Sequence, residues 1–251
     1  MPNILNLLAL SKKLQPIIML SHMRANTSLF GHILGNNPEI NGYYEMHIGY
    51  YSWKSLIRQK LKYLESHMFK PNSKYIFDKV LHNDHGINCN LFKSKGCHII
   101  ISLRPPEETI PSILNLYKKI DPSHEFATLE GAIEYYDSRL QMLEKYSDIL
   151  KSNFIYLDAN DIKNRTNDTF KLLEQELNLK TPLTSEYDIQ KMTGAKFAGD
   201  HSAALKKGTI IHQKNSYPEI NIKRDDMDKL NTLFMNTRIE IAKNSKNNPI
   251  I

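Results

Sequence analysis

The chain has 251 residues, of which 41% are hydrophobic and 24% charged, so it is long enough to bury a core without disulfides or metals. Its two cysteines, Cys89 and Cys97, lack the partners that a disulfide framework or a zinc site requires, so we expect a reducing compartment and no metal site. The net charge of +6 favours anionic partners. No nucleic-acid-reading motif accompanies this charge, so we expect no nucleic-acid partner.

The N-terminus carries a short apolar stretch, Ile4–Leu10, which we expect to form a short helix on the core. No basic region precedes it and no small-residue cleavage site follows it, so it is a poor signal peptide. No stretch approaches the length of about 18 apolar residues that a membrane span needs. The sequence therefore predicts a cytoplasmic protein without a transmembrane segment.

Strand and helix patterns alternate along the chain. Short apolar runs predict strands at Pro16–Leu20, Tyr75–Phe77, Cys97–Leu103 and Asn153–Leu157. Apolar residues at helical spacing predict helices at Thr27–Leu34, Tyr51–Met68, Glu107–Lys119, Leu129–Lys151, Thr166–Leu177 and Asp225–Lys243. This alternation predicts a three-layer αβα fold with a central parallel sheet. We expect one domain over residues 1–251, with its core at 16–215 and a C-terminal helix at 225–243.

The turn after the first predicted strand is a candidate phosphate site. Ligands of parallel sheets bind beyond the carboxyl ends of the strands, and a helix that begins near Thr27 would point its N–H groups and positive dipole there. Thr27 and Ser28 add hydroxyl donors, and Arg24 adds a permanent cation with fork geometry. The Walker A pattern G-x-x-x-x-G-K-S/T is missing. On these residues alone, Thr27 could equally be a helix N-cap and Arg24 a surface charge.

A second arginine also ends a predicted strand. Arg104 follows Cys97–Leu103, and Ser112 lies eight residues later on the next predicted helix. This spacing lets both side chains converge on one phosphate. The alternative is that Arg104 caps the surface end of the strand and Ser112 is a solvated helix residue.

The turn resembles the PRSGTS-L loop that binds the 5′-phosphosulfate in the sulfotransferase family, whose cofactor is 3′-phosphoadenosine-5′-phosphosulfate (PAPS). The matching residues are Arg24, Thr27, Ser28 and Leu29, and the departures are Met23 for Pro, Ala25 for Ser and Asn26 for Gly. Asn26 adopts a left-handed conformation more easily than most residues. The resemblance implies a P-loop-like fold and a cofactor site that includes Arg24, Ala25, Asn26, Thr27, Ser28 and Leu29.

The second arginine is similar to the family's 3′-phosphate motif, R-D-P-R with a serine eight residues after the first Arg. Arg104 and Ser112 match, and Pro105 replaces the usual Asp. Later in the chain, Lys206-Lys207-Gly208 fall where the family has a basic, glycine-containing loop over the cofactor. The resemblance implies that Arg104, Ser112 and this loop bind the 3′-phosphate.

The segment Asn37–Glu45 resembles the HPE-I-xG-xxE stretch of tyrosylprotein and related bacterial sulfotransferases, in which the final Glu is the proposed base. This implies that Glu45 takes a proton from the acceptor, although the ordinary pKa of His47 suits neutral pH better. The segment Tyr75–Lys79 is similar to the family's strand ending in D-K or N-K, which implies that Lys79 is a catalytic cation alongside Arg24. Lys79 could instead be an ordinary surface lysine.

The acceptor itself cannot be read from the sequence, and a small molecule, a saccharide and a peptide all fit. We expect the segments Tyr51–Met68 and Phe126–Asp148 to wall its pocket. Several aromatic residues could stack on an acceptor or fill the core, namely Tyr43, Tyr44, Tyr50, Tyr51 and Trp53.

The resemblance as a whole implies a PAPS-dependent sulfotransferase. Such an enzyme transfers a sulfuryl group to a hydroxyl or amine, leaves 3′,5′-phosphoadenosine (PAP), and uses no metal. Two alternatives stay open: a small-molecule kinase on a related nucleotide-binding fold, and a non-catalytic module that binds PAP or PAPS. Asn26 and Pro105, which depart from the family pattern, keep the second alternative open. The sequence gives no indication of oligomeric state.

Overall fold

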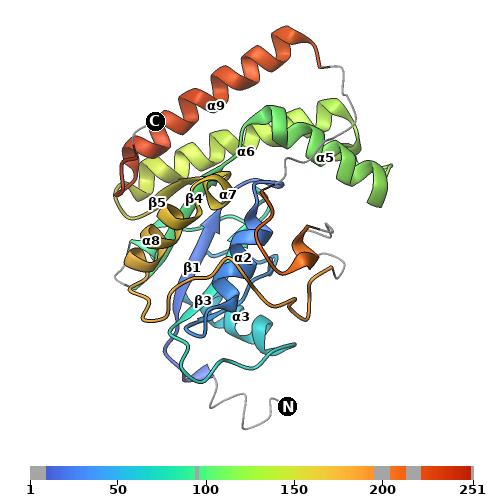
Figure 1. Ribbon diagram of the computed structural model, residues 1–251. Helices are drawn as coiled ribbons and strands as arrows, with labels where there is room; N and C mark the ends of the chain where they lie inside the picture. Colours follow the sequence, from blue (N-terminus) through green and yellow to red (C-terminus); the bar gives the residue numbers. More distant parts are fainter. Residues whose placement is uncertain (1–9, 94–95, 195–203, 213–221, 250–251) are drawn as a thin grey trace.

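The computed structural model describes residues 10–93, 96–194, 204–212 and 222–249 (Figure 1). Parallel strands form one five-stranded sheet in the order β2-β3-β1-β4-β5. The strands are β1 (Gln15–Leu20), β2 (Ile40–Asn41), β3 (Tyr75–Val80), β4 (His98–Leu103) and β5 (Ile155–Asp158). The predicted parallel sheet is therefore confirmed, and the two-residue strand β2 is an addition to it.

Helices connect the strands and close the chain. They are α2 (Thr27–Asn36), α3 (Trp53–Leu64), α4 (Cys89–Phe92), α5 (Pro106–Ile120), α6 (Leu129–Leu150), α7 (Asp161–Asn164), α8 (Thr166–Glu176) and α9 (Arg224–Asn244). Two short 3₁₀ turns are η1 (Glu125–Ala127) and η2 (Leu205–Lys207). The predicted helix at Ile4–Leu10 lies almost wholly outside the described residues. Within the described residues, no helix is long and apolar enough to cross a membrane.

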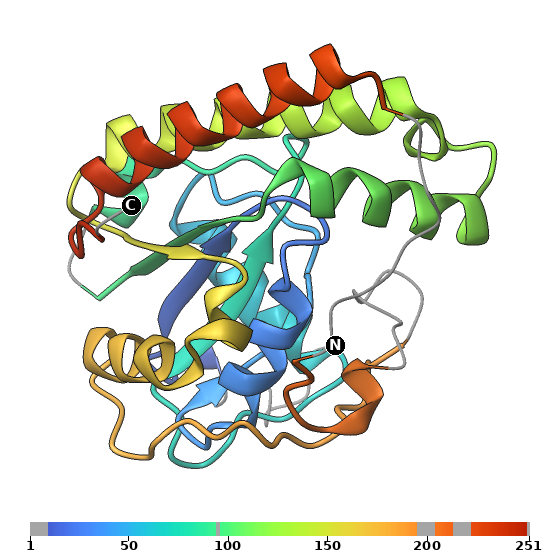
Figure 2. The same cartoon turned by 45° about the horizontal axis from the view of Figure 1, so that its top comes forward.

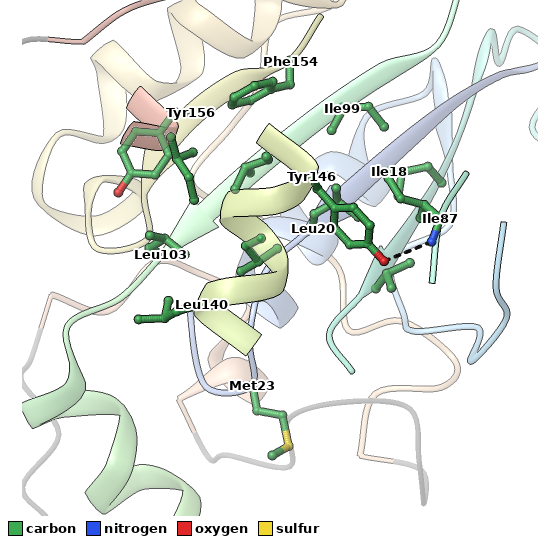
Figure 3. Close-up of a cluster of buried hydrophobic side chains, with 14 of the residues drawn as sticks. Ile18, Leu20, Met23, Ile87, Ile99, Leu103, Leu140, Tyr146, Phe154 and Tyr156 are labelled. Atoms are coloured by element: carbon green, nitrogen blue, oxygen red, sulfur yellow. Dashed lines mark hydrogen bonds between the residues drawn. The ribbon is translucent and has the colours of Figure 1, made fainter. Parts of the chain in front are cut away.

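Alternating side chains of the strands pack against helices on both faces of the sheet. Ile17 and Met19 of β1 belong to a buried cluster with apolar residues of α2 and α8. Ile18 and Leu20 belong to a second cluster with α5, α6 and α9. Figure 3 shows part of the second cluster, with Leu20 near the side chains of α6, and Figure 2 shows α9 lying alongside α6. This three-layer arrangement confirms the predicted αβα fold.

The carboxyl ends of the central strands meet at one edge of the sheet. Leu20, the last residue of β1, pairs with Val80 of β3 and with Ile101 of β4. The turn after β1 and the residues after β4 must therefore lie close together, as ligand sites in parallel sheets require. The strand β3 continues beyond the predicted Phe77, so Asp78 and Lys79 lie within it.

Helix α6 holds this edge through a buried cation. The side chain of Arg139 is fully buried, and its Nε and Nη2 donate to the carbonyl oxygens of Ser21 (2.8 Å) and Val80 (2.5 Å). Its Nη1 donates to Asn83 Oδ1 at 2.9 Å. These carbonyls lie at the ends of β1 and β3, and the Val80 carbonyl also accepts from the Ser21 N–H at 3.3 Å. Arg139 therefore joins both strand ends to α6.

Replacing Arg139 with methionine should lower the free energy of unfolding by about 3 kcal/mol or more, because buried carbonyl groups lose charged donors. Equilibrium urea unfolding measures this loss. The matched control is Arg165→Met, because the Arg165 side chain is 62% exposed and its change should stay within about 0.5 kcal/mol. Equal losses in the two variants would contradict the role of Arg139.

Candidate active site

The turn after β1 contains two residues in the left-handed conformation. Arg24 has φ 64° and Asn26 has φ 55°, so Asn26 takes the backbone conformation that glycine allows in the family loop. Its side-chain Nδ2 donates to the carbonyl of Ala159 (2.9 Å) and to Asn160 Oδ1 (3.1 Å). Asn26 therefore fits the glycine position and also fastens the turn to the segment after β5.

Helix α2 begins directly after this turn. The residue at its N-cap is Asn26, whose side chain makes no capping hydrogen bond, and its first turn contains no acidic residue. An α-helix leaves its first N–H groups without partners inside the helix, and its dipole is positive at that end. The start of α2 thus has the chemistry of an anion site at the carboxyl edge of the sheet.

The two predicted phosphate motifs meet in the structure. Arg24 Nε donates to Ser112 Oγ at 2.8 Å, and Arg104 Nη1 donates to the carbonyl oxygen of Arg24 at 2.8 Å. Arg104 and Ser112 are both buried. Residues that lie about 80 positions apart in the sequence therefore form one basic site at the ends of β1 and β4.

An acidic residue lies inside this basic site. Glu108 Oε2 accepts from Arg104 Nε (3.1 Å) and Nη2 (2.6 Å), and Glu108 Oε1 accepts from Asn160 Nδ2 (2.9 Å). Hydrogen bonds thus run from Asn26 through Asn160, Glu108 and Arg104 to the carbonyl of Arg24, and the backbone of residues 24–26 closes this polar ring. A guanidinium has five N–H groups, and these contacts use three of those on Arg104.

Lys79 reaches the same site from β3. Its side chain is buried, and its Nζ donates to Ser28 Oγ at 3.0 Å, in the first turn of α2. The structure therefore places Lys79 beside the predicted 5′-phosphosulfate loop and not on the surface. Lys79 is thus a second cation, besides Arg24, at the N-terminal end of α2.

His22 was missed by the sequence analysis and links the two phosphate motifs. It is fully buried, its Nδ1 lies 2.9 Å from the carbonyl oxygen of Met23, and its Nε2 accepts from the backbone N–H of Arg104 at 2.9 Å. Since a carbonyl only accepts, Nδ1 carries the proton and the ring is neutral. Burial lowers the pKa of His22 to about 3, which keeps the ring in this form.

Two adjacent tyrosines of α6 hold the same two loops. The Tyr135 hydroxyl accepts from the Met23 N–H at 2.7 Å and donates to the Leu81 carbonyl at 2.8 Å. The Tyr136 hydroxyl donates to the carbonyl of Arg104 at 2.7 Å. The pair is visible in the sequence, but nothing there indicates these partners, because they lie in loops that follow strands far away in the chain.

The candidate bases lie on the loop after β2. Glu45 is buried, and its Oε1 has no hydrogen-bond partner in the described part of the chain. His47 Nδ1 lies 3.6 Å from Glu45 Oε1, and the His47 side chain is 40% exposed. Glu45 is thus buried, and His47 beside it is partly exposed.

Asp78 of β3 anchors the loop that carries both bases. Its Oδ1 accepts from the Met46 N–H at 2.9 Å, and its Oδ2 accepts from the Tyr50 hydroxyl at 2.6 Å. Burial raises the pKa of Asp78 to about 7, and the nearby charge of Glu45 acts in the same direction. Asp78 therefore positions the loop, although the sequence pattern identified it only as the neighbour of Lys79.

A third histidine, His82, lies close to Glu45 and was also missed. Its ring packs against Tyr135 and Phe126, with centroids 5.4 Å and 6.3 Å away. Burial lowers its pKa, and the charge of Glu45 opposes that shift. A cavity of about 230 Å³ opens beside these rings, lined by residues 82–84 and others between 125 and 138. The segment Phe126–Asp148, which we expected to wall the acceptor pocket, contributes residues to this cavity. The other expected wall, Tyr51–Met68, contributes no residue to its described lining.

The late basic loop, Lys206-Lys207-Gly208, borders a pocket at the C-terminal end of α2. Lys207 and Gly208 line a pocket with Asn36, the last residue of α2, whereas the phosphate turn precedes the first residue of that helix. A helix of ten residues is about 15 Å long. The described contacts therefore do not bring Lys206, Lys207 or Gly208 to Arg104, and their role at the 3′-phosphate stays a prediction.

The neutral state of His22 should appear in the pH dependence of stability. An unfolded histidine binds a proton below about pH 6.5, whereas folded His22 does so only near pH 3. The unfolded state therefore binds more protons between these values, and stability is lost as the pH falls. Relative to His22→Gln, the wild type should lose about 1.4 kcal/mol per pH unit between about pH 6 and 4.

Urea unfolding at a series of pH values measures this difference. Asp78 is present in both proteins, so its own titration cancels from the comparison. Parallel stability curves for the wild type and His22→Gln would show that His22 titrates normally and would contradict the assignment.

Comparisons with known proteins agree with the fold. No protein-family model matches the sequence, and a comparison with curated proteins found no match. Among solved structures, a sulfotransferase domain from the curacin biosynthetic pathway superposes with a TM-score of 0.58 at 12% identity, covering 88% of this chain and 97% of that domain. The sulfotransferase domain of the Synechococcus PCC 7002 olefin synthase superposes with a TM-score of 0.58 at 13% identity, covering 89% of this chain and 96% of that domain. The chain therefore has the P-loop-like fold of sulfotransferase domains.

Proposed function

We propose that this protein is a sulfotransferase that transfers the sulfuryl group of PAPS to a hydroxyl or amine of a small-molecule, saccharide or peptide acceptor. The observation that carries the proposal is the junction of two phosphate motifs through Arg24, which bonds to Ser112 and to Arg104. A cofactor with phosphates at both ends of an adenosine needs two such motifs at one sheet edge. The shared fold with sulfotransferase domains supports the same conclusion.

The donor set suits the two anionic ends of PAPS. The start of α2, Arg24 and Lys79 provide N–H donors and cations for the 5′-phosphosulfate. Beyond its three contacts with described residues, Arg104 has two further guanidinium N–H groups, and Ser112 adds a hydroxyl for the 3′-phosphate. Glu108 opposes anion binding by its charge, so a bound phosphate must share Arg104 with it.

The chain's own residues perform the remaining chemistry. When bound, PAPS supplies the sulfuryl group. Glu45 is buried, and one of its oxygens has no hydrogen-bond partner among the described residues, so it takes the proton from the acceptor as the displacement proceeds in line. Lys79 and Arg24 neutralise the charge that grows on the transferred group and on the bridging oxygen. His47 and His82 lie near Glu45 and are rival proton acceptors.

Replacing Arg104 with alanine should weaken PAP binding by about 1.5–3 kcal/mol, the scale of a lost charged hydrogen bond. Isothermal titration calorimetry with PAP measures this change, and a thermal melt checks that the variant is folded. Binding of 5′-AMP, which lacks the 3′-phosphate, should change little. Arg165→Ala is the matched control. An unchanged PAP affinity in Arg104→Ala would contradict the assignment of Arg104 to the 3′-phosphate.

Replacing Glu45 with glutamine should lower turnover on the order of a hundredfold or more, because the variant cannot accept the proton. Turnover is followed as PAP released from PAPS in the presence of a mixture of hydroxyl and amine acceptors. His47→Asn should retain most of the activity, since His47 is partly exposed. The opposite pattern, with a normal Glu45→Gln rate and an inactive His47→Asn, would transfer the role of base to His47.

A further inference from the structure

Helix α3 presents a row of apolar side chains to the outside. Trp53, Ile57 and Leu61 follow one another at intervals of four residues and are 61%, 39% and 42% exposed. Such spacing places them on one face of the helix. Tyr51 and Met68, which flank the helix, are also exposed. Of the ten exposed large hydrophobic side chains in the described residues, five therefore lie within this short segment.

A row of cations runs beside the apolar row. Lys54, Arg58 and Lys62 each follow an apolar member by one residue, and all three are exposed. The helix contains no Asp or Glu. Just beyond its end, Glu65 pairs with Lys62 at 3.3 Å. The outer surface of α3 thus combines exposed apolar groups with positive charge.

The opposite face of α3 is fixed to the protein, so the helix cannot turn its apolar row inward. Tyr63 and Gln59 are buried, and the Tyr63 ring stacks on His67 and Phe69 with centroids 4.8 Å and 5.6 Å away. Ser52 and Ser55 form a capping box at its start. In Figure 1, α3 lies at the lower edge of the molecule, away from α5, α6 and α9.

We propose that α3 docks this protein on the surface of an anionic phospholipid bilayer. Basic amphipathic helices with an aromatic and aliphatic face lie in the membrane interface, where tryptophan is a favoured residue. Trp53, Ile57 and Leu61 enter the boundary of the acyl chains. Lys54, Arg58 and Lys62 contact the negative headgroups. This inference does not depend on the proposed sulfotransferase activity.

Charge favours this occupant over a second copy of the chain. Two α3 helices packed face to face would bring like charges together, since neither contains an acidic residue. An anionic bilayer neutralises the same cations. Helix α9 provides a contrast, because its exposed pair Met235 and Ile239 (42% and 45%) lies on a helix that also carries four acidic residues.

Trp53 is the only tryptophan of the chain, so its fluorescence reports directly on this face. The test mixes the full-length protein with vesicles of phosphatidylserine and phosphatidylcholine, or of phosphatidylcholine alone. With the anionic vesicles, the emission should shift to shorter wavelength and be quenched by brominated acyl chains. Added salt should weaken this binding because the headgroup attraction is screened.

Two sets of variants locate the surface. The single variants Lys54→Gln, Arg58→Gln and Lys62→Gln should each lower the partition coefficient of the protein into anionic vesicles about fivefold. The triple variant should lower it about a hundredfold. Ile57→Ser with Leu61→Ser should also abolish the quenching by brominated lipid. The matched control, Met235→Ser with Ile239→Ser on α9, should bind like the wild type. Thermal melts confirm that each variant is folded.

Three results would overturn the proposal. The first is the absence of any spectral shift with anionic vesicles. The second is equal binding by the wild type and the triple cation variant. The third is a short-wavelength emission of Trp53 without vesicles, since the row is then already covered by a second copy or by residues 1–9. Sedimentation velocity distinguishes these two cases, because only a second copy increases the mass of the particle.

Discussion

The anchoring of three strand ends to one helix is the constraint on which the candidate site depends. Arg139 bonds to the ends of β1 and β3, and its neighbours Tyr135 and Tyr136 bond to the turn after β1 and to the residue after β4. These groups are buried, so each backbone polar group needs its partner. Helix α6 thereby fixes the distance between the two phosphate motifs, which a cofactor with two anionic ends requires.

Asn26, which departs from the loop pattern of the sulfotransferases that the sequence resembles, has local partners. Asn26 takes the conformation of the family's glycine, and its amide bonds to Ala159 and Asn160 hold the turn in place. Asn160 in turn bonds to Glu108, which pairs with Arg104. The polar ring orients Arg104 before any ligand binds, at the cost of a carboxylate next to the proposed phosphate site. Preorganised donors lose less entropy on binding, which offsets part of this repulsion.

The sequence predicted the features that local residue patterns determine. It missed the side chains whose partners are backbone groups far away in the chain. Apolar β-branched runs identified β1 and β4. Arg104 and Ser112 each contact Arg24, and their convergence on one phosphate stays a prediction. The role of His22 could not be read, because its partner is the backbone of a residue 82 positions away. The pair Arg104 and Glu108 has ordinary helical spacing and could have been found. The role of Lys207 at the 3′-phosphate was inferred from the order of motifs along the chain, and it stays a prediction, since Lys207 borders a pocket with Asn36.

The most direct test of the account compares two nucleotides that differ only in the 3′-phosphate. Thermal unfolding of the wild-type protein is measured with PAP and with 5′-AMP at equal concentrations, since at equal concentration the ligand that binds more tightly stabilises the folded state more. If Arg104 and Ser112 form a 3′-phosphate site joined to the turn at Arg24, PAP will raise the melting temperature clearly more than 5′-AMP. Equal shifts, or no shift with either nucleotide, would contradict the account.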